Sequence, residues 1–156
     1  MSSIAEGAAA PDFDLPASGG RRVSLAALKG APFVLYFYPK ADTPGCTTEA
    51  CDFQEALPAL GATGVQVIGV SPDPMGPIEK FAKKHDLTFP LASDAEKQVA
   101  EAYGTWVEKS MYGKTYMGME RATFLVDAEG KVARIWRKVK VPGHAKAVKE
   151  AVAALG

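Results

Sequence analysis

The sequence is poor in several features that would narrow its function at once. It holds 2 cysteines and 2 histidines in 156 residues, and its 18 Lys and Arg residues balance its 18 Asp and Glu residues. A neutral balance gives no electrostatic footprint for nucleic acid or for an anionic membrane surface. No apolar run approaches the roughly 20 residues of a membrane-spanning helix. Nucleic-acid binding and a membrane-spanning role are therefore not expected.

The first residues, MSSIAEGAAAPDF, also lack the basic and then apolar pattern of a secretory signal. We therefore expect a cytoplasmic protein. In that compartment thiols are normally reduced, and a close pair of cysteines is more often catalytic, redox-active or metal-binding than structural. A metal site is not expected, because two cysteines are too few for a closed zinc site and His85 and His144 show no ligand-like spacing.

What the sequence does contain is the composition of a folded domain, with 47% hydrophobic residues. This suffices for a core without disulfides, and we expect one domain over residues 1–156. Continuous apolar runs at 33–38, 65–71 and 122–127 are typical of strands buried on both faces of a sheet. A helical pattern over about 43–60 follows the first of these strands.

Weaker patterns complete the prediction. The other expected elements are an N-terminal hairpin turning at 17–20, a helix from Ile78, a short strand in 89–94, a helix in 95–104 capped by Asp94, a return strand in 131–137 and a helix in 144–155. Residues 105–120 show no clean period and are expected to form a long loop. The alternation of strands and helices, with a late hairpin, predicts an α/β three-layer domain with a mixed sheet, compatible with a thioredoxin-like architecture.

Both cysteines stand in one stretch, YPKADTPGCTTEACDF, over residues 38–53. The strand–loop–helix pattern places Cys46 in the first turn of a helix. The N–H groups of that turn have no partner within the helix, and the helix dipole adds positive charge, so both favour a nucleophilic thiolate. The alternative is a small buried hydrophobic residue, which leaves the second cysteine and this setting unexplained.

Two neighbours of Cys46 have both a structural and a functional interpretation. Thr43 can be the N-cap of the helix, and its hydroxyl can also bond the sulfur and an oxygen bound beside it. Pro39 ends the preceding strand, and its ring can also shield the sulfur from water.

The spacing of the cysteines does not permit a disulfide within an intact helix. Cys46 and Cys51 lie five residues apart, which in a regular helix separates their Cα atoms by about 8.6 Å and turns them about 140° around the axis. A disulfide needs a separation below ~7 Å. Either the two never react together, or the first turns of the helix unwind when they do, as suits a catalytic disulfide.

Pro39, Thr43 and Cys46 match the P-x-x-x-T/S-x-x-C signature of peroxiredoxins. The segment FYPKADTPGCTTEAC resembles the subgroup called bacterioferritin comigratory protein, or peroxiredoxin Q, which often places its resolving cysteine five residues after the peroxidatic one. The resemblance continues through MYGKTYMGMERATFLVD and KVKVPGHA, and it covers most of the chain between residues 8 and 155.

This resemblance implies a thioredoxin-like fold and the reduction of hydroperoxides without a metal or cofactor. It implies that Cys46 is the peroxidatic and Cys51 the resolving cysteine, and that Thr43, Pro39 and Arg121 lie beside the reacting sulfur. The resulting intramolecular disulfide would be reduced by thioredoxin or a glutaredoxin.

Other residues receive plainer interpretations. Glu49 follows Cys46 by three positions, and a surface carboxylate is slightly favoured over a role in orienting Arg121. His85 and His144 are interpreted as ordinary helix residues. The zero net charge and the lack of a long apolar helix face indicate a monomer.

Two other functions stay open at this point. A thiol–disulfide oxidoreductase acting on protein disulfides would have the same fold, although the sequence has no C-x-x-C motif. A redox sensor would oxidise the same cysteines without turnover and could use KSMYGKTYMG as a partner surface. Insulin reduction would reveal the first, and a stoichiometric response to peroxide the second.

Overall fold

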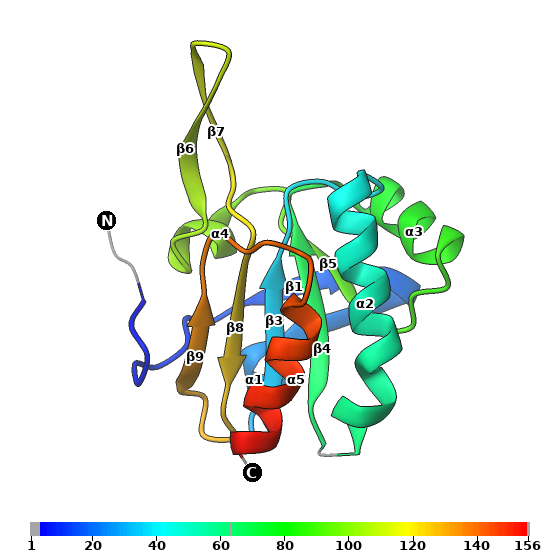
Figure 1. Cartoon of the computed structure of the whole chain (residues 1–156), viewed down its shortest axis with the longest axis vertical. Coiled ribbons are helices and arrows are strands. Elements are labelled where there is room, and N and C mark those ends of the chain that lie inside the picture. The colour runs from blue at the N-terminus through cyan, green and yellow to red at the C-terminus, as the bar shows by residue number, and fades with distance from the viewer. Residues whose placement is uncertain (1–3, 63, 156) are drawn as a thin grey trace.

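The computed structural model describes residues 4–62 and 64–155. Its centre is a seven-stranded mixed sheet in the order β2-β1-β5-β4-β3-β8-β9, and β6 and β7 form a separate two-stranded sheet (Figure 1). The strands are β1 (Asp14–Ala17), β2 (Arg21–Ser24), β3 (Phe33–Phe37), β4 (Gln66–Ser71), β5 (Leu91–Ser93), β6 (Trp106–Met111), β7 (Lys114–Met119), β8 (Ala122–Val126) and β9 (Val132–Trp136). The helices are η1 (Ser18–Gly20), α1 (Leu25–Leu28), α2 (Pro44–Gly61), α3 (Met75–Lys84), α4 (Gln98–Ala102) and α5 (His144–Leu155).

The central strand β3 shows why the continuous apolar run forms a strand with no exposed face. It pairs in parallel with β4 and antiparallel with β8, and all of its residues are buried. Its side chains alternate between two apolar clusters, with residues 33, 35 and 37 in one and residues 34 and 36 in the other. The sheet is therefore covered on both sides.

The two apolar clusters define the layers. Buried side chains of α2, α3 and α5 pack in one cluster, and those of α1 and α4 pack in the other, on the opposite face of the sheet. This confirms the predicted α/β fold with a mixed central sheet flanked by helices. Within the described part of the chain, no helix has both the length and the apolar composition that crossing a bilayer requires.

Most predicted elements are confirmed, with shifted ends. α3 begins three residues before Ile78, at Met75. α4 is shorter than predicted, because Lys97 adopts a left-handed backbone and becomes the N-cap residue. Asp94 nevertheless bonds the helix start, since its carboxylate accepts from the amides of Val99 and Ala100 at 3.3 and 2.7 Å.

The prediction of a loop over residues 105–120 is wrong. These residues form the β6–β7 hairpin, which extends away from the body of the fold (Figure 1). Tyr112 and Gly113 make its turn with φ values of 53° and 77°, as a tight two-residue hairpin turn requires. Both faces of its outer half are exposed, so the sequence there lacks the apolar and polar alternation that normally reveals a strand.

Candidate active site

The start of α2 is where the sequence predicts it. Thr43 is the N-cap residue with an extended backbone, and Pro44 occupies the first turn, where a missing N–H removes no helix bond. Cys46 follows in the same turn, so its amide is among those without an intrahelical acceptor. The cysteine is only 1% exposed.

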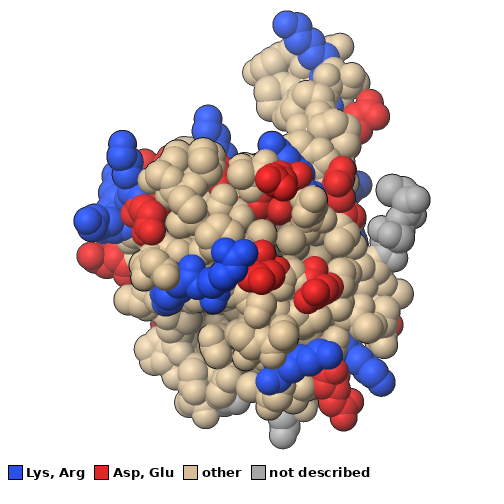
Figure 2. Space-filling view, turned by 180° about the vertical axis from the view of Figure 1, so that it is seen from behind, with Lys and Arg blue, Asp and Glu red and all other residues tan. Residues whose placement is uncertain are grey.

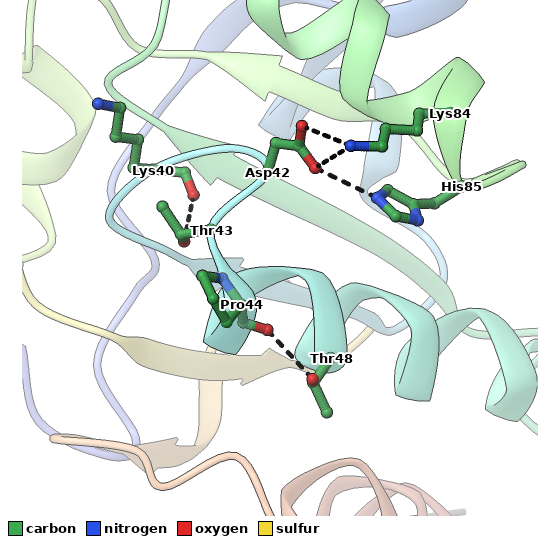
Figure 3. A network of polar contacts seen from close by, with 7 residues as sticks. All are labelled: Lys40, Asp42, Thr43, Pro44, Thr48, Lys84 and His85. Atoms are coloured by element: carbon green, nitrogen blue, oxygen red, sulfur yellow. Dashed lines mark hydrogen bonds and ion pairs between the residues drawn. The ribbon is translucent and has the colours of Figure 1, made fainter.

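The Thr43 hydroxyl does not bond a helix amide. It donates instead to the Lys40 carbonyl at 2.9 Å (Figure 3). Among the described residues it is not bonded to the Cys46 sulfur, so its predicted contact with sulfur and substrate stays a prediction.

Asp42 ties the loop before α2 to α3. Its backbone is left-handed, with φ of 62°, and its carboxylate accepts from Lys84 Nζ at 3.1 and 3.3 Å (Figure 3). His85 Nε2 lies 3.3 Å from the same carboxylate, so this histidine contacts the loop from the end of α3. Because exposed ion pairs add little stability, the contact mainly fixes the path of the loop into α2.

Arg121 reaches Cys46 because β8 runs antiparallel to β3. Phe37, the last residue of β3, pairs with Ala122, the first residue of β8, so Arg121 stands beside the loop that leads into α2. Its Nη2 donates to Cys46 Sγ at 3.3 Å. Its Nη1 donates to a carboxylate oxygen of Glu49 at 2.6 Å, which fixes the orientation of the guanidinium.

Gly45 is a site residue that the sequence analysis missed. A Cβ at this position would lie 3.2 Å from Arg121 Nη2. The glycine therefore lets the guanidinium approach the first turn of α2 and reach the sulfur. The only sequence signal is a glycine at a helix start, and a glycine there is equally typical of a loop entering a helix.

The slight preference for Glu49 as a surface carboxylate is wrong. The residue is 1% exposed, and its Oε2 is buried with no hydrogen-bond partner in the described part of the structure. Burial raises the pKa of Glu49 to about 7, against the opposing effect of Arg121. Glu49 contacts Arg121 because the helix places it one turn after Cys46, on the face that meets the sheet.

Cys51 lies further along the same helix and is half-buried. Both cysteines are free thiols, and α2 runs unbroken through them, so helix geometry keeps their sulfurs from joining in this conformation. Burial, together with the charges of Asp52 and Glu55, raises the pKa of Cys51. The site thus combines a buried, guanidinium-bonded sulfur with a second, protonated thiol that cannot reach it while the helix stays intact.

A family model described as the AhpC/TSA family matches residues 7–135. The chain belongs to that family, the peroxiredoxins. Peroxiredoxin Bcp of Bacillus subtilis is 49% identical over 142 residues, covering 91% of this chain and 90% of the relative. Peroxiredoxin Bcp of Escherichia coli is 42% identical over 144 residues, covering 92% of each chain.

Solved structures agree with this assignment. The bacterioferritin comigratory protein of Xanthomonas campestris, studied for its alkyl peroxide reduction, matches with a TM-score of 0.88 and 45% identity over 92% of this chain and 91% of the other. A cysteine-to-serine mutant of PrxQ from Xylella fastidiosa matches with a TM-score of 0.93 and 35% identity over 99% of each chain. This peroxiredoxin is a thiol-dependent peroxidase with a thioredoxin-like fold.

Pro39 occupies the bend after β3 and is half-buried. Its position fits the predicted end of the strand, and its shielding of the sulfur stays a prediction. Within residues 4–62 and 64–155, no group of three or more His, Cys, Asp or Glu side chains is arranged to hold a metal ion.

His144 is more than an ordinary helix residue in this peroxiredoxin. It begins α5, is 6% exposed, and its Nε2 lies 2.7 Å from the Thr123 hydroxyl on β8. Burial and the charge of Arg121 lower the pKa of His144 to about 4, so the ring is neutral at neutral pH. A neutral ring adds no second positive charge behind Arg121. The helical pattern around His144 in the sequence does not indicate its burial or its contact with Thr123.

Proposed function

We propose that this peroxiredoxin reduces hydrogen peroxide and organic hydroperoxides with Cys46 as the peroxidatic residue and Cys51 as the resolving residue. The observation that carries the proposal is the hydrogen bond from Arg121 Nη2 to Cys46 Sγ at 3.3 Å. A guanidinium in this position holds the sulfur and carries positive charge towards the oxygens on which negative charge develops. Arg121 can do this because Glu49 holds its other end.

In the first step the Cys46 thiolate attacks the terminal oxygen of the hydroperoxide. The S–O bond forms with an electron pair of sulfur, the O–O bond breaks, and the other oxygen leaves as hydroxide or alkoxide and takes up a proton. The product is a sulfenic acid at Cys46. Thr43 would position the hydroperoxide, and Pro39 would limit the access of water.

The intact helix α2 holds the two cysteines too far apart for a disulfide. In the second step its first turns therefore unwind. The Cys51 sulfur attacks the sulfur of the sulfenic acid, the disulfide forms and water leaves. An external dithiol then reduces the disulfide by thiol–disulfide exchange. We propose thioredoxin or a glutaredoxin as this reductant, and a monomeric, single-domain, cytoplasmic enzyme.

The experiment is a count of free thiols in the reduced protein before and after one equivalent of hydrogen peroxide. Loss of both thiols without a covalent dimer supports the scheme. Cys46→Ser should not consume peroxide, and Cys51→Ser should react once and stop as a sulfenic acid. Normal turnover of Cys51→Ser with thioredoxin would overturn the assignment of Cys51.

The same preparation separates the other two candidate functions. A protein disulfide oxidoreductase would reduce insulin efficiently and consume peroxide poorly. A redox sensor would consume one equivalent of peroxide and stop even with excess reductant. Sustained consumption of peroxide in the presence of a dithiol excludes both as the main activity.

A further inference from the structure

A lysine on the β6–β7 hairpin is directed towards the candidate active site. The hairpin projects from the body of the molecule (Figure 2), and most of its outer residues are exposed. Lys109 is an exception, because it is half-buried. It pairs across the hairpin with Tyr116, and the pair two residues nearer the base, on the same face because side chains alternate along a strand, is Val107 with Gly118. Directly paired residues share a face of the hairpin, so all four lie on one face.

Gly118 gives the direction of the Lys109 side chain. A Cβ built on Gly118 would lie 3.1 Å from Lys109 Cδ and 3.4 Å from its Cε. The stem of the lysine therefore runs diagonally over the glycine backbone, away from the tip and towards the base of the hairpin. The chain leaves that base through Glu120 to Arg121, so the stem carries the ammonium towards the arginine whose guanidinium contacts Cys46.

The charges around Lys109 agree with this direction. Burial and the positive charge of Arg121 lower the pKa of Lys109, while Glu120 and Cys46 oppose them. In the described part of the chain no carboxylate lies within ion-pair distance of Lys109. A half-buried ammonium beside a like charge is unfavourable unless an anion comes to meet it. The anion that reaction at Cys46 generates is the leaving oxygen of the hydroperoxide.

We propose that Lys109 is a second cationic group of the peroxide site, which stabilises the leaving oxygen and supplies its proton. The proposal rests on Cys46 being the peroxidatic residue. As the S–O bond forms and the O–O bond breaks, the leaving oxygen takes a proton from the Lys109 ammonium and departs as water or an alcohol. The neutral amine then regains a proton from solvent. Arg121 stays charged throughout, because a guanidinium does not give up its proton at neutral pH.

The chemistry of the leaving group provides the test. Hydroxide and alkoxides are strongly basic and need a proton, whereas peracetic acid releases acetate, which is stable without one at neutral pH. We therefore compare the rate of Cys46 oxidation in a single turnover by hydrogen peroxide and by peracetic acid. In Lys109→Gln the rate of Cys46 oxidation should fall about 100-fold with hydrogen peroxide, which is the low end of the range for general acids. With peracetic acid the same rate should fall only about twofold.

The matched control is Lys114→Gln, at the far end of the same hairpin. Lys114 is exposed and pairs with Met111 next to the turn, so its loss should change neither rate by more than about twofold. Equal losses with both oxidants in Lys109→Gln would overturn the proposal, because they would indicate an effect on the sulfur or on the fold. No loss with either oxidant would overturn it as well.

A second variant moves the lysine without removing it. Gly118→Val places a side chain where the Lys109 stem lies, in a backbone conformation that permits it, and valine suits a strand. Gly118→Val should slow Cys46 oxidation by hydrogen peroxide selectively, as Lys109→Gln does. In a Lys109→Gln background it should cause no further loss of rate. Additive losses in the double variant would contradict the role of Gly118.

The controls also separate this inference from the proposed function. If the wild-type protein keeps both thiols after one equivalent of peroxide, the proposed function fails. If the wild-type protein loses both and Lys109→Gln reacts as fast as the wild type, only the role of Lys109 fails.

Discussion

Arg121 donates a hydrogen bond to Cys46 Sγ at 3.3 Å across 75 positions of the chain. The same guanidinium donates to Glu49 at 2.6 Å, so it connects a carboxylate with the sulfur. The position of Arg121 depends on the antiparallel register of β3 and β8, which puts Ala122 opposite Phe37. A shift of that register by one residue would turn the arginine to the other face of the sheet.

Replacement of Arg121 by glutamine should slow the oxidation of Cys46 by hydrogen peroxide by about 100- to 1000-fold, the usual cost of losing one donor to a developing oxyanion. The rate is measured in a single turnover, by quenching and mass analysis of the sulfenic acid. Arg22→Gln is the control, because that arginine forms an exposed ion pair with Asp14. An unchanged rate in Arg121→Gln would remove the arginine from the site.

Gly45→Ala should change stability and activity in opposite directions. Alanine stabilises a helix relative to glycine by about 0.5–1 kcal/mol, but its Cβ would lie 3.2 Å from Arg121 Nη2 and displace the guanidinium. The rate of Cys46 oxidation should fall about tenfold. Gly61→Ala is the matched control in the same helix, since its Cβ meets nothing within 4 Å. Equal rates in both variants would show that Gly45 does not serve the approach of Arg121.

The buried carboxyl of Glu49 predicts a pH dependence of stability. Its pKa rises from 4.5 to about 7 in the fold, so the folded state binds more protons than the unfolded state between these values. The contribution of Glu49 to the free energy of unfolding is fully present below about pH 4.5 and is lost as the pH rises through 7. The unfolding free energy of the wild type, measured in urea relative to that of Glu49→Gln, should therefore fall by on the order of 2–3 kcal/mol from about pH 4.5 to pH 8.

His144 acts in the opposite direction over nearly the same range. Its pKa falls from 6.5 to about 4 on folding, so its contribution is present above 6.5 and is lost as the pH falls towards 4. In Glu49→Gln the opposing carboxyl is gone, and stability should fall visibly on acidification through this range. A flat profile in that variant would contradict the shift of His144.

The proposed unwinding of α2 predicts that disulfide formation depends on local helix stability. Thr48 lies between the two cysteines, and its hydroxyl donates to the Pro44 carbonyl at 3.1 Å (Figure 3). Thr48→Ala and Thr48→Gly both lose this bond but differ by about 1 kcal/mol in helix propensity. The glycine variant should form the Cys46–Cys51 disulfide about fivefold faster than the alanine variant, with the same rate of sulfenic acid formation.

Ala59→Gly is the control for this pair, because it weakens the exposed far end of the same helix. Disulfide formation is followed by the loss of the second thiol after rapid oxidation with one equivalent of peroxide. Equal rates in the two Thr48 variants would mean that unwinding between the cysteines does not limit the step.

Much of the fold could be predicted because its signals are local. The runs that form β3, β4 and β8 are apolar almost without interruption, and α2 has a threonine followed by proline at its start. The β6–β7 hairpin could not be predicted in the same way. Its exposed faces carry no alternation, and its turn depends on left-handed dihedrals at Tyr112 and Gly113, for which tyrosine gives no signal.

The chain by itself determined that Cys46 lies in the first turn of a helix and that Cys51, five residues on, is out of its reach while that helix persists. Those are consequences of helix geometry. Only the tertiary structure decided which charges surround the sulfur. Glu49 is buried, Arg121 is turned towards Cys46 and the Lys109 stem runs towards the base of the hairpin, because β8 pairs with β3 and the hairpin leads into β8. Contacts between residues so distant along the chain depend on strand register, and no short segment of sequence encodes that register.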